Sequence, residues 1–367
     1  MSDSPRVVLL SIDGLSHASV SPETTPHLWS LAAAGGRAPE GGRCDLPAVT
    51  YVSHATLATG TPPLTHGLTS NLAASPRPDV VPGWAGADQV QVPPIFAALR
   101  AAGLRSAAIC GDQNLVGIMR TETADVVWPA GGVLPEGTPT CPSGYATNAA
   151  IREQLLAAVG DSDLDVVFGH LNEPDTCGHR FGPDDPRTTA AYQDADALVG
   201  EVVAAIGADW ERTVLIVLSD HGMEAVTAPP VDLLAHDAVR AVVTDVVNDG
   251  GAALARLRDG VSLRDATQAV SAVTGVAGVE ALRDGVLLVV GEPGTVFTAG
   301  ASKHIRGMHG GPGTCVTIAV VGGGHPAVAR IAAAIAARPP HLADWAPTVA
   351  AIVGAVMPTA EGRSLAG

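Results

Sequence analysis

Short apolar runs rich in β-branched residues recur along the chain, and each is followed by Gly, Asp or Ser and then by a helical pattern. These runs cover residues 6–14, 105–112, 165–172, 213–222 and 315–324. Near-continuous apolar strands that alternate with helices are typical of a parallel sheet with both faces covered. We therefore predict a doubly wound α/β fold built on a mostly parallel sheet.

Helical patterns lie between the apolar runs, at residues 25–35, 92–103 and 191–207. In the first two segments a proline stands near the start and a glycine ends the pattern, which is the usual asymmetry of helix ends. These helices are expected to cover the faces of the sheet.

The segment from about residue 226 to residue 303 breaks this alternation. Its pattern predicts a helix (VDLLAHDAVRAVV), an exposed Asn-Asp-Gly-Gly turn, a second helix (SLRDATQAVSAV) and an apolar strand (GVLLVVGE). Such a block fits a small α+β insertion that caps the main sheet. The predicted division is a core of residues 1–225 and 304–367 and a cap of residues 226–303.

Composition and charge limit the possible partners. Hydrophobic residues make up 47% of the 367 residues, which allows a sizeable core, but aromatic residues make up only 3% and offer few surfaces for stacking bases. The net charge of −16 disfavours a nucleic acid polymer as a partner. An anionic substrate would therefore need local neutralisation, and bound metal cations are the usual means.

The cysteines and the apolar runs predict the location. The five cysteines are scattered and form no Cys-x-x-Cys pair, so a reducing compartment fits better than a disulfide framework. The first residues lack the pattern of a signal peptide, and no apolar run is long enough to span a membrane. We expect a cytoplasmic protein with no membrane partner, and its oligomeric state stays open.

Six potential metal ligands lie near predicted strands, mostly where those strands end. In an open parallel sheet, functional side chains collect at the carboxyl ends of the strands. Each residue alone is a weak signal, since an Asp between a strand and a Gly is more often a turn former. Together, carboxylate oxygens and imidazole nitrogens are the ligands that a pair of zinc-like ions prefers. The six residues are Asp13, Asp175, His179, Asp220, His221 and His309.

Thr50 stands in the stretch DLPAVTYVSHATLATG, between a proline turn and a run of small polar residues. A β-branched hydroxyl residue is a common strand filler. The alternative interpretation is a nucleophile, which would need an activating group elsewhere in the chain.

Together these motifs resemble those of the alkaline phosphatase superfamily, specifically its nucleotide pyrophosphatase/phosphodiesterase and phosphonoacetate hydrolase branches. The resemblance implies that Asp175, His179 and His309 hold one metal ion and that Asp13, Asp220 and His221 hold the other, with the Thr50 oxygen at or between the ions. The similar stretches, which occur in family order from residue 6 to residue 365, are VVLLSIDGL, LPAVTYVSHATLATGTPPLTHGLTSN, LNEPDTCGHRFGP, VLSDHGM, GMHGG and DWAPTVAAIVGAVMPTAEGRSLAG.

The resemblance also implies a mechanism. Two divalent ions roughly 4 Å apart can stabilise both the attacking and the leaving oxygen of an in-line displacement. Their charge would lower the pKa of the Thr50 hydroxyl, so that its oxygen attacks phosphorus and forms a phosphothreonine intermediate, which water then releases. Zinc is favoured, and manganese is also compatible with three histidines and three aspartates.

Four residues are candidates for substrate binding: Ser53, His54, Asn71 and Lys303. Asn71 matches an Asn that binds a phosphoryl oxygen in relatives, whereas Ser53 stands where relatives place a second Asn, which leaves its role open. Lys303, the only lysine of the chain, fits either a contact to a substrate anion or a solvated loop. The paired lysines that grip phosphonoacetate in its hydrolase would fall near residues 110–114, where no lysine occurs. Phosphonoacetate itself is therefore disfavoured.

The expected function is a phosphodiesterase or nucleotide pyrophosphatase that acts on a small soluble substrate. A threonine nucleophile in this superfamily goes mainly with phosphodiesters, nucleotide pyrophosphates and phosphonates. The alternatives are hydrolysis of the C–P bond of another phosphonate, a phosphomonoesterase activity, and a metal-stabilised scaffold without catalysis.

Overall fold

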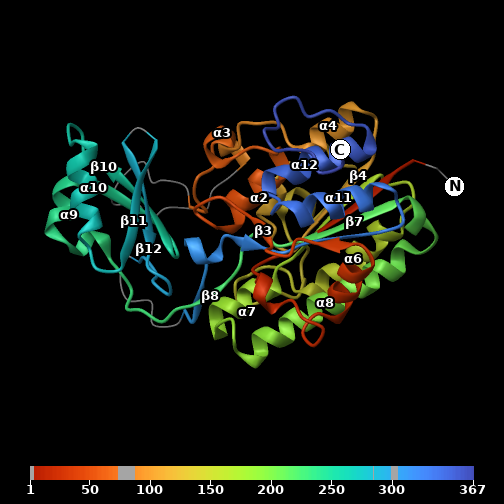
Figure 1. Cartoon of the computed structure of the whole chain (residues 1–367), viewed down its shortest axis with the longest axis horizontal. Helices are drawn as coiled ribbons and strands as arrows, with labels where there is room; N and C mark the ends of the chain where they lie inside the picture. Colours follow the sequence, from red (N-terminus) through yellow and green to blue (C-terminus); the bar gives the residue numbers. More distant parts are fainter. Residues whose placement is uncertain (1–3, 73–86, 284, 299–304) are drawn as a thin grey trace.

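The computed structural model describes residues 4–72, 87–283, 285–298 and 305–367 (Figure 1). Its main sheet has seven strands in the order β2-β15-β7-β1-β6-β4-β5. The strands from β7 to β5 in this order run parallel, as the mostly parallel α/β fold predicts. The bounds are β1 Arg6–Ile12, β2 Gly36–Arg37, β4 Ser106–Cys110, β5 Val126–Trp128, β6 Val166–Leu171, β7 Thr213–Leu218 and β15 Ala319–Gly322.

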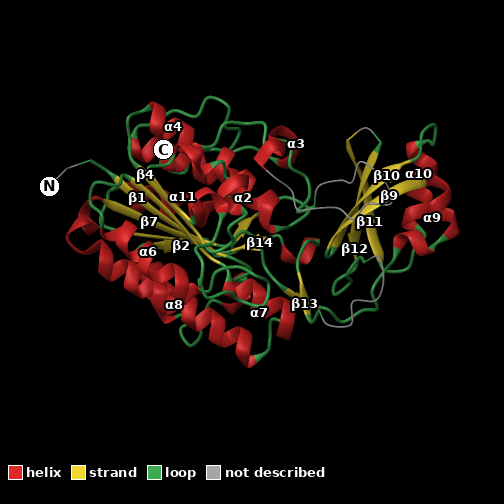
Figure 2. Cartoon of the chain, turned by 180° about the vertical axis from the view of Figure 1, so that it is seen from behind, coloured by secondary structure: helices red, strands yellow, loops and turns green. Residues whose placement is uncertain are grey.

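Helices cover both faces of this sheet, as Figure 2 shows. Alternate side chains of β1 enter two different hydrophobic clusters. Val7 and Leu9 pack with α2, α4, α11 and α12, whereas Val8 and Leu10 pack with α1, α6 and α8. The helices of the main unit are α1 Pro26–Ala34, α2 Thr50–Thr59, α3 Pro63–His66, α4 Ile95–Ala101, α5 Leu115–Ile118, α6 Asn148–Gly160, α7 Glu173–Phe181, α8 Pro186–Ile206, α11 Ala327–Ala337 and α12 Trp345–Val353.

The predicted helices of the main unit are present, and their largest boundary error is at the start of α8. This helix begins at Pro186, five residues before the predicted start. Asp185 caps it by accepting a hydrogen bond from the N–H of Arg187, and proline fits the first turn of a helix. No helix among the described residues is long and apolar enough to cross a membrane.

The prediction of one parallel strand over residues 315–324 is wrong. The segment forms two short strands, β14 (Val316–Thr317), which pairs with β3 (Gly42–Arg43), and β15, which is antiparallel to β7. The chain reaches β15 from His309, at the edge where the parallel strands end, and no crossover helix intervenes. It therefore runs back along the sheet in the opposite direction.

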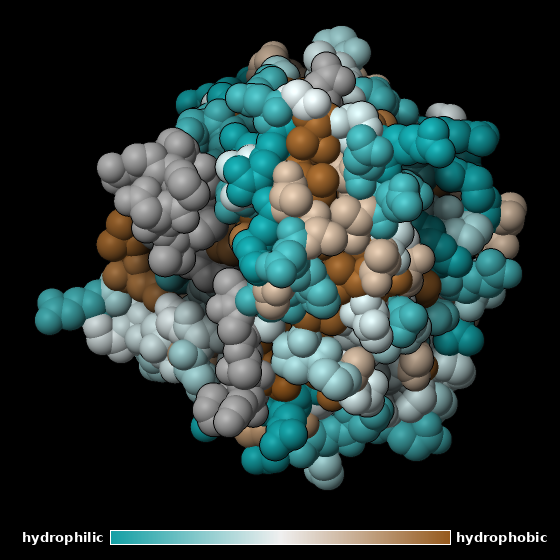
Figure 3. Space-filling model, turned by 90° about the vertical axis from the view of Figure 1, so that its left-hand side faces the viewer, coloured by the Kyte–Doolittle hydropathy of each residue, from teal (hydrophilic) through white to brown (hydrophobic). Residues whose placement is uncertain are grey.

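A second sheet is built from β9 Val243–Asp249, β10 Ala252–Leu257, β11 Val276–Arg283 and β12 Val286–Gly291, and it is antiparallel in the order β11-β12-β10-β9. The helices α9 (Asp237–Val242) and α10 (Leu263–Ser271) pack on one face around Val239, Val270 and Val289. Figure 3 looks onto this side of the molecule, where hydrophilic residues interleave with small hydrophobic groups. The segment pattern identified α9, α10 and β12 but missed β9, β10 and β11, and α9 begins at Asp237, six residues after the predicted start. The cap boundaries at residues 226 and 303 stay a prediction.

The Asn-Asp-Gly-Gly turn is buried, which corrects the prediction of an exposed turn. Gly250 and Gly251 form the two-residue turn of the β9–β10 hairpin, and Asp249 is 5% exposed. The turn inserts into the main unit, where Gly251 N–H donates to the carbonyl of His309 over 2.8 Å. Gly310 has a φ of +104°, and a Cβ there would lie 1.9 Å from the Asp249 carbonyl oxygen. The tertiary contact buries a turn that the local sequence marks as polar.

Candidate active site

The six predicted ligands form two groups at the carboxyl edge of the main sheet. Asp13 follows β1, and Asp220 and His221 follow β7. Asp175 and His179 lie on α7, directly after β6, and His309 follows the short strand β13 (Gly307–Met308), which pairs with β8 (Glu224–Ala225). Within each group the ligand atoms lie within 4.8 Å of one another. The groups are adjacent, since the rings of His221 and His309 stack with centroids 3.7 Å apart.

The three histidines present the same nitrogen to the site. Nδ1 of His179 lies 3.0 Å from the Gly307 carbonyl oxygen, and Nδ1 of His309 lies 2.9 Å from that of Ala48. His221 makes the equivalent 3.0 Å contact to Gly222. A backbone carbonyl only accepts, so each Nδ1 carries the proton and each Nε2 keeps its lone pair. This tautomer is the one that a metal-ligating histidine needs.

Each of the three aspartates has one buried oxygen without a hydrogen-bond partner among the described residues: Asp13 Oδ1, Asp175 Oδ1 and Asp220 Oδ2. These oxygens face the Nε2 atoms. Asp13 Oδ1 lies 3.4 Å and Asp220 Oδ2 3.3 Å from Nε2 of His221, and Asp175 Oδ1 lies 3.3 Å from Nε2 of His179. Three orphaned acceptors that face nitrogen lone pairs fit two divalent cations.

Burial makes this arrangement unfavourable without positive charge. It raises the pKa of Asp13 well above its ordinary value and raises the pKa of Asp220 to about 6. It also lowers the pKa of His221 to about 3, so this ring does not supply the missing charge itself. A bound cation offsets the burial of charged carboxylates.

Gly14 allows the two groups to approach each other. Its φ is +67°, and a Cβ on it would lie 3.0 Å from the Cα of Asp175. Its N–H also donates to Asp220 Oδ1 over 3.3 Å. The turn Asp13-Gly14 therefore needs glycine for both its conformation and its packing.

Thr50 is the first residue of α2, and it lines the same cavity as Asp13, Asp175, His179 and His309. Oγ1 lies 3.1 Å from Nε2 of His221. Asn71 is close by, because its Oδ1 accepts from the N–H of Tyr51 over 2.8 Å. The cavity has a volume of about 300 Å³ and is lined by Asp13, Thr50, Tyr51, Asn71, Asp112, Ser143, Tyr145, Asn172, Asp175, His179 and His309.

Five of these lining residues were not predicted: Tyr51, Asp112, Ser143, Tyr145 and Asn172. Asp112 and Asn172 follow β4 and β6, so the strand-end rule that selected Asp13 could have selected them as well. Burial raises the pKa of Asp112 to about 7. Ser143 and Tyr145 come from an irregular loop for which the sequence carries no comparable signal.

His170 is a supporting residue that the sequence analysis did not select as a candidate. It is fully buried on β6, opposite Ser11 of β1. Its Nδ1 accepts from the N–H of Asp112 over 3.3 Å, so its Nε2 donates to Asp13 Oδ2 over 3.1 Å. His170 thus fixes one oxygen of Asp13 while the other faces His221.

Of the other predicted substrate-binding residues, His54 and Ser53 do not line the cavity, unlike Asn71. His54 is fully buried, with Nε2 3.0 Å from Ser11 Oγ and Nδ1 2.8 Å from the Thr50 carbonyl oxygen, so it supports the backbone of Thr50 and does not line the cavity. Ser53 is 2% exposed and also absent from the lining. Lys303 lies outside the described residues.

The main sheet is mostly parallel, carries two Asp/His groups at its carboxyl edge and has a threonine at a helix start beside them. This arrangement is that of the alkaline phosphatase superfamily. The family model described as type I phosphodiesterase/nucleotide pyrophosphatase matches residues 7–277, and the chain belongs to this family.

Three relatives illustrate the family and the fold. The chain is 28% identical over 253 residues to human ectonucleotide pyrophosphatase/phosphodiesterase family member 7, an alignment that covers 62% of this chain and 50% of the relative. An inactive threonine-to-alanine variant of murine ectonucleotide pyrophosphatase/phosphodiesterase 5, solved in complex with AMP, matches with a TM-score of 0.73 at 17% identity over 96% of both chains. Phosphonoacetate hydrolase of Sinorhizobium meliloti, solved with phosphonoacetate, matches with a TM-score of 0.65 at 19% identity over 86% of this chain and 90% of the hydrolase. The chain spans about half the length of the curated relatives it matches.

Proposed function

We propose that this protein is a phosphodiesterase or nucleotide pyrophosphatase for a small soluble substrate, with Thr50 as its nucleophile. The observation that supports this proposal most strongly is the position of Thr50 Oγ1. It lies at the start of α2, 3.1 Å from Nε2 of His221, in a cavity lined by Asp13 of one Asp/His group and by all three residues of the other. The inactive threonine-to-alanine variant of the murine relative agrees with a threonine nucleophile.

The side chains divide the work as follows. Asp175, His179 and His309 would hold one divalent cation and Asp13, Asp220 and His221 the other, zinc or manganese; when bound, these ions lower the pKa of the Thr50 hydroxyl and offset the charge of the phosphoryl oxygens. The Thr50 oxygen attacks phosphorus, a P–O bond to threonine forms, and the leaving group departs with the electrons of its own bond to phosphorus. Water then displaces phosphorus from Thr50 and restores the hydroxyl.

Asn71 is suited to hold a phosphoryl oxygen. Its Oδ1 is fixed by the N–H of Tyr51, and this orients the side-chain amide at the edge of the cavity. Its Nδ2 remains a donor for an anionic oxygen, as in an oxyanion hole. His54, through its contact with the Thr50 carbonyl, keeps the first turn of α2 in place.

The lining of the cavity supports a diester or pyrophosphate over phosphonoacetate. Asp112 lines the cavity and lies within residues 110–114, near which the resemblance would place the lysines that grip the phosphonoacetate carboxylate. A carboxylate in the lining repels the carboxylate of phosphonoacetate, and a diester, which can present a neutral ester group there, avoids this repulsion. The likeness in fold to phosphonoacetate hydrolase keeps a phosphonate without a carboxylate as the second candidate.

Two further predictions belong to this proposal. Residues 226–303, which include the second sheet, act as a cap over the cavity. A cytoplasmic location fits the cysteines, all five of which are free.

The test is the hydrolysis of bis-p-nitrophenyl phosphate by the wild type and by Thr50→Ala, with the metal content of both measured. We expect the variant to lose turnover while it still binds two metal ions per chain, and Thr50→Ser to retain part of the activity. Unchanged turnover in Thr50→Ala would overturn the assignment of the nucleophile. A wild type that hydrolyses p-nitrophenyl phosphate alone indicates a monoesterase, and one that hydrolyses no ester or phosphonate indicates a scaffold.

A further inference from the structure

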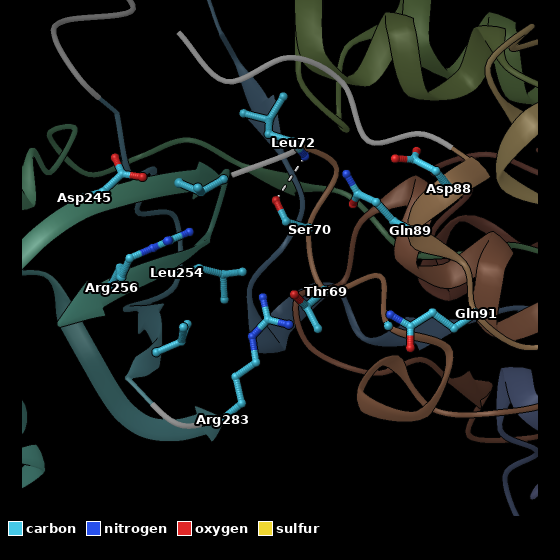
Figure 4. Close-up of a pocket in the computed structure, with 13 residues that line it drawn as sticks. Thr69, Ser70, Leu72, Asp88, Gln89, Gln91, Asp245, Leu254, Arg256 and Arg283 are labelled. Atoms are coloured by element: carbon cyan, nitrogen blue, oxygen red, sulfur yellow. Dashed lines mark hydrogen bonds between the residues drawn. The ribbon is translucent and has the colours of Figure 1, made fainter. Parts of the chain in front are cut away.

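A second cavity, of about 350 Å³, lies where the second sheet meets the main unit (Figure 4). One wall comes from the main unit, from residues 67–72 and 88–91. The other wall comes from the open face of the second sheet. The lining residues are Gly67, Thr69, Ser70, Leu72, Asp88, Gln89, Gln91, Asp245, Val247, Leu254, Arg256, Arg283 and Val286.

Strand pairing places four of these residues in a row across the second sheet. Arg283 of β11 is opposite Val286 of β12, Val286 is opposite Arg256 of β10, and Arg256 is opposite Asp245 of β9. Residues that are directly opposite in antiparallel strands point to the same face of the sheet. Two arginines therefore flank Val286 on the face that lines the cavity.

The guanidinium groups of this row are available to a ligand. Neither Arg256 nor Arg283 forms an ion pair within the described part of the chain. Asp245, the strand neighbour of Arg256, and Asp88, on the opposite wall, also line the cavity and offset part of the positive charge. Figure 4 shows Arg283 extending from β11 toward Thr69 and Ser70. In this row of four residues, Arg283 pairs with Val286 and not with an acidic residue, whereas Arg256 pairs with Asp245.

The other lining groups suit a polar ligand with an apolar stem. Gln89 and Gln91 carry amide groups, and Thr69 carries a hydroxyl, all at the wall opposite the arginines. Leu254 and Val247 supply a buried apolar floor from β10 and β9. Arginine forks match carboxylate and phosphate oxygens, which no other side-chain type does as well.

The two cavities share a wall. Asn71 lines the cavity that holds Thr50, whereas its chain neighbours Ser70 and Leu72 line the second cavity. Asp249, at the tip of the β9–β10 hairpin, accepts from the N–H of Asn71 over 3.2 Å and closes the boundary between the two spaces. A substrate that reaches both cavities would have to pass the segment 69–72, which contributes residues to each lining.

We propose that the second cavity binds an anionic group, a carboxylate or a phosphate, at the far end of a phosphodiester substrate whose phosphorus lies at Thr50. The proposal rests on the proposed function and refines its substrate class. Arg283 and Arg256 are the recognising residues, and Asp245 limits their affinity. The physiological substrate is then a diester or pyrophosphate with a second anionic group, separated from the reacting phosphorus by a spacer.

The experiment compares p-nitrophenyl phosphodiesters whose second ester group is an alkyl chain that ends in a methyl, a carboxylate or a phosphate, in a series of chain lengths. For the wild type we expect KM to be about tenfold lower for an anionic end than for a methyl end at the best length, and added salt to reduce the difference. Arg283→Gln and Arg256→Gln should abolish the preference, and Asp245→Asn should increase it. The carboxylate and phosphate arms show which anion is preferred.

Arg264→Gln is the matched control, since Arg264 is an exposed arginine on α10 outside the cavity. It should leave the preference unchanged. An equal KM for anionic and methyl ends at every length, or a preference that survives both arginine substitutions, would overturn the proposal. Calorimetric binding of the same alkyl phosphates, without the p-nitrophenyl group, to Thr50→Ala gives a readout that needs no turnover. It separates failure of the second cavity from failure of the proposed chemistry.

Discussion

Replacing Asp249 by alanine tests whether the second sheet positions a residue of the active site. The Asp249 carboxylate accepts from the N–H of Asn71 through Oδ1 over 3.2 Å, and its buried Oδ2 has no hydrogen-bond partner among the described residues. Alanine leaves the Asn71 N–H without its acceptor. Because Asn71 is only partly buried, water replaces some of the lost bond. At about pH 4, where Asp249 is neutral in the folded state, we expect a loss of about 1 kcal/mol in stability, the low end of the range for an unpaired donor.

The effect on turnover should be larger than the effect on stability. Loss of an entire oxyanion donor lowers kcat by about 100-fold or more in other enzymes, and a donor that is loosened but still present should cost less. We therefore expect kcat for bis-p-nitrophenyl phosphate to fall about tenfold, with a small change in melting temperature. Asp249→Asn keeps an acceptor oxygen and should recover most of the activity.

Steady-state kinetics and thermal unfolding of both variants check this expectation, with Asp259→Ala as the control, since Asp259 is exposed in the same sheet unit. Wild-type kcat in Asp249→Ala would refute the positioning role. So would an asparagine variant that is folded but as slow as the alanine variant.

The same residue predicts a pH dependence of stability. Burial raises the pKa of Asp249 to about 7, above its unfolded value, so the folded state binds more protons between about pH 4 and about pH 7. Stability from this group therefore falls as pH rises through that window, by at most about 4 kcal/mol. Asp249→Asn does not titrate, so its unfolding free energy relative to wild type should rise from about pH 5 to about pH 8 in urea titrations. An unchanged difference would show that the carboxylate is not held at a raised pKa.

Three further predictions concern the metal site, a buried histidine and a glycine. Removal of divalent cations by a chelator should lower the melting temperature by about 5 °C or more, because it leaves three buried carboxylates uncompensated. Added zinc should restore the melting temperature, and an identical melting curve with and without chelator would contradict two-cation binding. Burial lowers the pKa of His66 to about 4, so the free energy of unfolding should fall as pH drops from about 6.5 to about 4. His66→Gln should remove up to about 3 kcal/mol of this fall in acid unfolding. The same pH dependence in the variant and the wild type would refute this. Gly310→Ala should destabilise the fold by at least about 2 kcal/mol, because its Cβ would overlap the Asp249 carbonyl. Gly103→Ala should cost less, since Gly103 also has a positive φ but has open space around it. Equal losses in chemical unfolding would contradict the steric argument.

The parts of the site that the sequence predicts are those that follow strand ends. Asp13, Asp220 and His221 stand directly after continuous apolar runs, and such runs identify buried parallel strands without knowledge of the rest of the fold. Asp112 occupies an equivalent position, and it was missed because no partner motif drew attention to it.

The parts that the sequence does not predict depend on contacts between distant segments. His170 reads as an ordinary core residue until β6 is known to lie beside β1. Tyr145 comes from an irregular loop without periodicity. Strand β9 directly follows α9, and no Gly or Pro marks the change from helix to strand. In β11 the alternation of apolar and polar residues is too weak to predict a strand. Whether a polar turn such as Gly250-Gly251 is exposed is decided by the surface it meets, which no local pattern encodes.

The buried tip of the β9–β10 hairpin has a consequence for how this insertion can vary in length. A strand reverses the faces of its side chains with each added residue, so one residue inserted into β9 or β10 turns Asp249 away from Asn71. The helices α9 and α10 pack around Val239 and Val270, on the face of the sheet turned away from the second cavity, and carry no such restriction. We expect insertions and deletions around these helices to be tolerated, while the inner end of the hairpin is held to one length by the chemistry of the site.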